Sequence, residues 1–204
     1  MIYRKKVPPT DSNLSEALIN TGWKKIREPK NLFVAVMLSV PFMILNSLIT
    51  LYFVSPIRNW LVELGRKLDS FSFVFTVDIK FFAYIIIVFA FLVVHELLHA
   101  IPIPDFMNSK KTFWGITPFG GFVSTTEEIS KRRFVLISII PFVVLSLIMP
   151  IILNFANGFN GFVVFLAIMN ALGSSVDILN MLLIAIQVPN GSRIINNGFE
   201  TYFK

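Results

Sequence analysis

The sequence predicts an all-α integral membrane protein, with about four transmembrane helices and a small membrane-associated β-hairpin between helices 2 and 3. Two observations predict this class. Of the 204 residues, 55% are hydrophobic and only 15% are charged, and the mean hydropathy is +0.73. A soluble domain needs roughly a quarter of its residues charged to cover its surface, so the apolar excess must face lipid. In addition, four stretches reach the roughly 20 apolar residues that cross a bilayer.

These four stretches define the expected helices. They cover residues 32–54, 81–103, 134–156 and 161–188. The first and third contain no charged residue, the second contains only His95, Glu96 and His99, and the fourth contains only Asp177. The first stretch begins too far from Met1 for a cleavable signal peptide, so we expect it to remain as a helix. The expected organisation is an N-terminal segment, a transmembrane domain and a C-terminal tail, residues 1–31, 32–188 and 189–204.

The distribution of basic residues predicts a multi-pass protein of the cell membrane with both termini in the cytoplasm. Residues 1–31, 104–133 and 189–204 hold seven, five and two Lys or Arg, against four in residues 55–80 and none in the turn near Asn157. Basic loops tend to stay on the cytoplasmic side. The same rule accounts for the net charge of +6, so we expect no nucleic-acid partner. The 55–80 connection has apolar residues at helical spacing and is expected to lie on the outer surface.

The 104–133 connection is predicted to contain the β-hairpin. Residues 112–117 and 122–126 are rich in aromatic and β-branched side chains, and they flank the turn-forming run Pro118-Phe119-Gly120-Gly121. The alternative is an irregular loop with its aromatic side chains at the headgroup level, because short apolar runs are ambiguous by pattern alone.

The second expected helix carries the motif that indicates chemistry, His95-Glu96-Leu97-Leu98-His99. Four residues are just over one helical turn, so both imidazoles project from one face and can bind one metal ion. Glu96 lies beside them, in position to take a proton from an attacking water. Zinc suits such ligands, and the chain has no cysteine to offer a thiolate. The alternative is a set of hydrogen-bonded polar residues in a helix bundle, although ionisable residues in a membrane are costly and usually functional.

A catalytic zinc site needs a third protein ligand, and Asp177 is the candidate. Besides Glu96 it is the only acidic residue in the expected spans, and its expected depth is close to that of His95. Asn170, Ser174 and Asp177 recur at helical spacing, in a polar stripe that should face into the bundle. There, Asn170 or Ser174 could hydrogen-bond a ligand carboxylate or a substrate carbonyl. The alternative for Asp177 is a polar contact between helices without a metal.

With this motif in a membrane span and Thr117-Pro118-Phe119-Gly120-Gly121-Phe122-Val123 after it, the chain resembles the site-2 protease group of intramembrane metalloproteases. It looks more closely like the small bacterial membrane proteins described as putative zincin peptidases. Site-2 proteases have a similar Pro-x-Gly-Gly-aromatic stretch in a β element after the metal-binding helix. Their third ligand is an aspartate in a later helix, a role that the resemblance gives to Asp177. The resemblance covers residues 81–188. Here Asn170 has no accompanying proline and Ile178 replaces the usual glycine, which allows a different local helix geometry and substrate gate.

Together these features predict an intramembrane zinc metalloprotease of the HExxH type, a hydrolase that cleaves a peptide bond in or near a membrane-spanning segment. The expected cofactor is Zn²⁺, the expected partners are a membrane protein or peptide substrate and the lipid bilayer, and the expected catalytic residue is Glu96. We expect the hairpin to accept the substrate as a further strand. The expected substrate-binding residues are Gly120, Gly121, Phe122, Asn170 and Ser174. The alternatives are a noncatalytic metal-binding membrane scaffold or a metal-ion transporter, although no internal repeat typical of transporters is visible.

Overall fold

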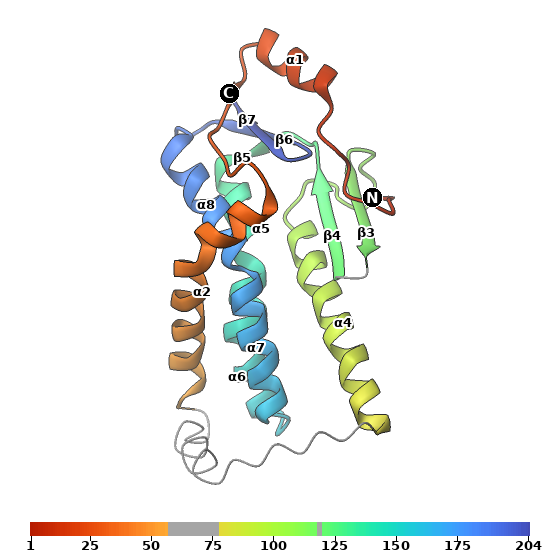
Figure 1. Cartoon of the computed structure of the whole chain (residues 1–204), viewed down its shortest axis with the longest axis vertical. Coiled ribbons are helices and arrows are strands. Elements are labelled where there is room, and N and C mark those ends of the chain that lie inside the picture. Colours follow the sequence, from red (N-terminus) through yellow and green to blue (C-terminus); the bar gives the residue numbers. More distant parts are fainter. Residues whose placement is uncertain (57–77, 118–119) are drawn as a thin grey trace.

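The computed structural model describes residues 1–56, 78–117 and 120–204. Long helices run side by side along the molecule, and two small sheets lie at one end of them (Figure 1). Helix α1 (Ser12–Asn20) and both chain termini lie at the same end. Most of the connection that we expect to be amphipathic, residues 57–77, lies outside the described residues.

The described residues include four helical segments that are long and apolar enough to cross a membrane. They are α2 (Leu32–Val54), α4 (Ile79–Ala100), a segment formed by α5 (Lys131–Pro141), the π-helix η1 (Phe142–Ile148) and α6 (Met149–Phe155), and a segment formed by α7 (Gly161–Gly173) and α8 (Ser175–Gln187). They agree with the four predicted spans to within a few residues at each end. The chain is therefore consistent with a multi-pass membrane protein.

Short polar side chains begin these segments. Before each one, a side chain accepts a hydrogen bond from a backbone N–H of the first turn, which has no partner within the helix. The capping residues are Asn31, Asp78, Ser130 and Asn160. Each helical segment thus begins where the sequence itself supplies a polar cap.

The four segments differ in how deeply they lie in the bundle. Only 6% of the most apolar stretch of α4 is buried inside the molecule, against 50% for the α7–α8 segment. Polar contacts join this central segment to α2: Asn46 Nδ2 donates to the Ala171 carbonyl (3.2 Å), and Ser175 Oγ donates to Ser39 Oγ (3.1 Å). The α7–α8 segment is therefore the centre of the bundle, and the exposed apolar surface of α4 is of the kind that lipid covers.

One sheet contains the predicted hairpin. Strands β3 (Thr112–Thr117) and β4 (Gly120–Thr125) pair antiparallel, and β1 (Ile2–Tyr3) pairs parallel with the other edge of β3. The structure confirms the predicted hairpin and not the alternative of an irregular loop, although the second strand begins two residues earlier than expected. Strand β4 lies at the edge of the sheet and packs against α4.

The second sheet shows that the all-α prediction is only approximate. Helices take up about 58% of the residues that the structure describes. The rest includes a sheet in the order β2 (Lys24–Lys25), β7 (Glu200–Phe203), β6 (Arg193–Asn197) and β5 (Ile129–Ser130). These strands are short and most of their partners are distant in sequence, so local patterns do not reveal them. The one signal in the sequence was the glycine at position 198. It lies at the turn between β6 and β7 with a φ of 62°, a conformation that glycine adopts without strain.

Candidate metal centre

Helix α4 presents His95 and His99 one turn apart. Because a regular helix separates them by four residues, both rings leave the same face, and their Nε2 atoms lie 3.2 Å apart. Each side chain is only 12% exposed. Helix α5 and strand β4 pack against α4, so the ligand face is shielded on the helix that is otherwise the least buried of the four segments.

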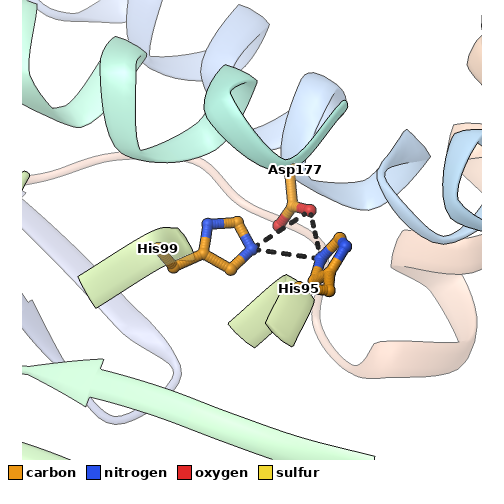
Figure 2. Close-up of side chains that lie close together, drawn as sticks. All are labelled: His95, His99 and Asp177. Atoms are coloured by element: carbon orange, nitrogen blue, oxygen red, sulfur yellow. Dashed lines mark hydrogen bonds and ion pairs between the residues drawn. The ribbon is translucent and has the colours of Figure 1, made fainter. Parts of the chain in front are cut away.

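Asp177 lies in the first turn of α8 and completes a group of three residues that could hold a metal ion. Its Oδ2 is 3.6 Å from His95 Nε2 and 3.5 Å from His99 Nε2. Figure 2 shows the two rings of α4 and the carboxylate of α8 directed toward one point. In a tetrahedral zinc site with bonds of about 2.0–2.1 Å, the ligand atoms lie roughly 3.3 Å apart. The donor atoms and their spacing therefore fit zinc.

Each imidazole is held by a hydrogen bond at its other ring nitrogen. His95 Nδ1 lies 2.7 Å from Asn170 Oδ1, and His99 Nδ1 lies 2.8 Å from the Ile137 carbonyl oxygen. Both partner atoms are acceptors, so each ring donates from Nδ1 and keeps the lone pair of Nε2 for a metal.

Glu96 lies beside the histidines, against strand β4. Its Oε2 accepts a hydrogen bond from the Val123 N–H (3.3 Å). The strand can approach this closely because Gly121 has no side chain: a Cβ there would lie 3.2 Å from Glu96 Cγ. The second glycine of the Gly-Gly run thus brings the backbone of β4 to the carboxylate of α4.

A cleft of about 290 Å³ opens at the candidate metal centre. Its walls include Glu96, His99 and Asp177, together with residues 123–125 of β4. A second cavity, of about 150 Å³, is lined by Glu96 and His95 among others. The Glu96 carboxylate therefore lies where both a small molecule such as water and an extended chain have room.

The expected substrate-binding residues lie at different distances from this cleft. Gly120 begins β4, opposite Thr117. Phe122 packs over its cross-strand partner Gly115 and lines neither cavity. Asn170 is buried and binds His95. Ser174 is buried where α7 meets α8, and its hydroxyl has no hydrogen-bond partner among the described residues.

Three hydrogen bonds at the site were not predicted from the sequence, and all three involve backbone atoms. They are the Val123 N–H on Glu96, the Ile137 carbonyl on His99 and the Pro141 carbonyl on Asn170. A backbone group leaves no trace in a residue pattern. Pro141 was the one available signal, because a proline inside a helix leaves the carbonyl four residues earlier without its usual donor.

Within the described residues, four membrane-length helices and a shielded group of two histidines and an aspartate are consistent with a membrane protein that carries a metal centre. A comparison with known protein families matches residues 86–193, more than half of the chain, to the family described as putative zincin peptidases. The chain belongs to this family, as its residues predicted. The family suggests a metallopeptidase and implies zinc binding. Comparisons with curated proteins and with solved structures find no match. The likeness to site-2 proteases stays a prediction.

Proposed function

We propose that the chain is an intramembrane zinc metallopeptidase, which hydrolyses a peptide bond in or near a membrane-spanning segment of its substrate. The observation that supports this most directly is the convergence of His95 Nε2, His99 Nε2 and Asp177 Oδ2, which lie 3.2 to 3.6 Å apart. Two imidazole nitrogens and a carboxylate oxygen directed to one point at this spacing are the set of ligand atoms that a zinc site uses.

Zinc bound by these residues supplies a Lewis acid that polarises the scissile carbonyl. The proton transfers belong to Glu96. Its carboxylate takes a proton from the water that attacks the amide carbon, and it returns that proton to the nitrogen as the C–N bond breaks. The Val123 N–H holds one carboxylate oxygen of Glu96, so the side chain stays directed along the cleft.

The edge of β4 is the surface that we assign to the substrate. Amides within a helix are hydrogen-bonded internally, so a membrane-spanning substrate must be extended at the scissile bond. Strand β4 is an edge strand, and its residues 123–125 line the same cleft as Glu96. An extended segment added at this edge would pass the carboxylate. Asn170 uses its amide on His95 and its neighbours, so we no longer assign it to the substrate.

The active site is placed near the cytoplasmic face in this proposal. His99 lies in the last turn of α4, at the end of the bundle where the sheets and both termini lie (Figure 1). The larger number of basic residues belongs to that end, and basic loops tend to stay in the cytoplasm. Water can then reach the cleft without crossing the bilayer.

The experiment compares wild-type protein with Glu96→Gln in cells. Glutamine has the size of glutamate but cannot take a proton. Both proteins should carry one zinc per chain after purification. New protein N-termini, identified by chemical labelling and mass spectrometry of membranes, should appear only with the wild type. Glu128→Gln is the matched control, because Glu128 is half exposed and pairs with Arg193 away from the cleft.

The alternatives give different outcomes. A noncatalytic scaffold would give the same N-termini with wild type and Glu96→Gln. A transporter would change cellular zinc flux and leave the N-termini unchanged. Either result would overturn the proposed proteolysis.

A further inference from the structure

The third helical segment interrupts its own hydrogen bonding next to His99. Pro141 has no N–H, so the α-helical bond to the Ile137 carbonyl cannot form. The following N–H, that of Phe142, donates to the Ile139 carbonyl. A proline ring also crowds the carbonyl four residues before it and tilts it away from the helix. This Ile137 carbonyl is the one that lies 2.8 Å from His99 Nδ1.

The carbonyl of Pro141 acts on the other histidine through Asn170. Asn170 Nδ2 donates to the Pro141 carbonyl oxygen (3.1 Å) and to Ser146 Oγ (2.8 Å). Ser146 donates its own proton to the Ala167 carbonyl (2.9 Å), so it can only accept from Asn170. Both amide hydrogens are then in use, and Oδ1 faces His95 Nδ1 at 2.7 Å. The orientation of the amide therefore requires His95 to donate from Nδ1.

The π-helix explains how these two acceptors reach one side chain. Pro141 and Ser146 are five residues apart, which is the hydrogen-bonding interval of a π-helix. The segment Phe142–Ile148 is π-helical, so the Pro141 carbonyl and the Ser146 hydroxyl lie on the same side. Short π-helical segments are frequent at functional sites.

We infer that Pro141 is a positioning residue that sets the tautomer of both metal-binding histidines. Its missing N–H reserves the Ile137 carbonyl for His99, and its own carbonyl orients Asn170 for His95. Both rings then present an unprotonated Nε2 to the same point. Outer hydrogen-bond partners of this kind typically contribute about 10- to 100-fold to metal affinity. The inference deepens the proposed function, because it rests on the same metal centre.

The tautomers can be measured directly, because the chain has only two histidines. The full chain is purified through a tag without histidine, labelled with ¹⁵N-histidine, freed of metal and held at a pH that keeps both rings neutral. Nitrogen chemical shifts then distinguish protonated from unprotonated ring nitrogens. Each ring is assigned by the loss of its signal in His95→Ala or His99→Ala. We expect the proton on Nδ1 in both wild-type rings.

Variants separate the two connections. Pro141→Ala returns an N–H to the helix and should redistribute the His99 proton. Asn170→Leu removes the oxygen that accepts from His95 Nδ1, so it should redistribute the His95 proton. Asn170→Asp keeps an acceptor oxygen and should preserve the wild-type tautomer of His95. Pro141→Ala and Asn170→Leu should each weaken Co²⁺ and Zn²⁺ binding about 10- to 100-fold and change the visible spectrum of bound Co²⁺. Pro41→Ala is the matched control, because Pro41 also lies inside a membrane-length helix, α2, and takes no part in the hydrogen bonds of either histidine.

Two results would overturn the inference. One is a wild-type ring protonated at Nε2, and the other is a folded Pro141→Ala chain with unchanged tautomers and an unchanged cobalt spectrum. Circular dichroism shows whether that variant folds. If it does not fold, the wild-type tautomers and the Asn170 pair decide the question. A chain with the expected tautomers that cleaves nothing would disprove the proposed proteolysis and leave this inference intact.

Discussion

The helix bundle and the sheets at its end contribute different parts of the candidate site. The bundle supplies all three candidate ligands, two from α4 and one from α8. The sheets supply none of the three, but β4 brings the Val123 N–H and the bare backbone of Gly121 against Glu96. Metal binding therefore depends on how the helices pack, whereas access to the carboxylate depends on a strand. The two properties should therefore respond to different substitutions.

The two regions are also held together in different ways. The bundle relies on apolar surface with a few buried polar contacts. The sheets instead tie distant parts of the chain together: β1 pairs with β3 and β2 pairs with β7. In addition, Asp11 and Asn197 exchange two hydrogen bonds, at 3.1 and 2.7 Å. Polar substitutions at the sheet end should thus affect stability more than metal binding.

The largest effect is expected in the bundle, from Asp177→Asn. Asparagine keeps the shape of aspartate but replaces a charged carboxylate, a zinc ligand, with a neutral amide. Zinc affinity should fall by at least about 100-fold, beyond the range for outer partners, and proteolysis should be lost while the helical content stays unchanged. Metal titration and circular dichroism measure the two properties.

Loop substitutions provide the control for this prediction. Asp105→Asn, Glu127→Gln and Glu128→Gln, all between α4 and α5, should change neither zinc binding nor cleavage. If Asp177→Asn kept full zinc while one of the loop variants lost it, the third ligand would belong to the loop.

The next effect is expected at the sheet end, from Gly121→Val. A Cβ at this position already lies 3.2 Å from Glu96 Cγ, so the larger side chain must displace β4 or the carboxylate. Small misplacements of catalytic groups cost about 100-fold in rate. We expect cleavage to fall by about 10- to 100-fold with zinc content unchanged. Gly161→Ala is the control, because a Cβ there meets nothing within 4 Å. Loss of zinc in Gly121→Val would show that the two regions are not separable.

The bundle could be predicted from the sequence because its signals are local. A span needs only its own apolar residues, and two histidines four apart share a helix face wherever the helix lies. Asp177 was found because a charge stands out in an apolar segment. Its distance from His95, however, depends on the packing of α4 against its neighbours, which no single segment determines.

The sheet end could be predicted only in part, because most of its pairings join distant residues. The β3–β4 hairpin was visible, since its strands are adjacent in sequence. Strand β2 pairs with β7 across most of the chain, and neither strand is long enough to form a pattern. The hydrogen bond between Asn170 and His95 was not predicted either. The Asn170 amide is directed by Pro141 and Ser146 on another segment, so this partner could not be inferred from its own helix.

The membrane orientation of the sheets can be tested without changing activity. Lys110, between α4 and β3, and Ala156, at the opposite end of the bundle after α6, are both exposed, and the chain contains no other cysteine that would react. In intact cells, Ala156→Cys should react with an impermeant thiol reagent and Lys110→Cys should not, because basic loops stay in the cytoplasm. The reverse labelling would place the sheets and the cleft outside.

The smallest effect is expected from Glu28→Gln, which alters the sheet end without touching the bundle ligands. The Glu28 carboxylate accepts hydrogen bonds from the Thr201 N–H (2.5 Å) and Oγ1 (3.0 Å). Burial raises its pKa above the ordinary value of 4.5, and these hydrogen bonds oppose the shift. A raised folded-state pKa means that the contribution of Glu28 to stability is fully present below about pH 4.5 and is lost as the pH rises through the folded value.

Glutamine accepts a hydrogen bond from Thr201 without carrying a charge, so Glu28→Gln should remove the loss of stability that the ionised Glu28 carboxylate causes at higher pH. We expect the variant to unfold a few degrees above wild type at neutral pH and to match it in acid, as measured by thermal unfolding in detergent. Glu200→Gln is the opposite control, because the hydrogen bond from Lys25 lowers the pKa of the Glu200 carboxyl. That contribution is present at neutral pH and is lost in acid, so Glu200→Gln should be less stable than wild type at neutral pH and approach it as the pH falls. If both variants followed the wild-type curve, neither carboxylate would affect the stability of the sheet end, and zinc content should be unchanged in both.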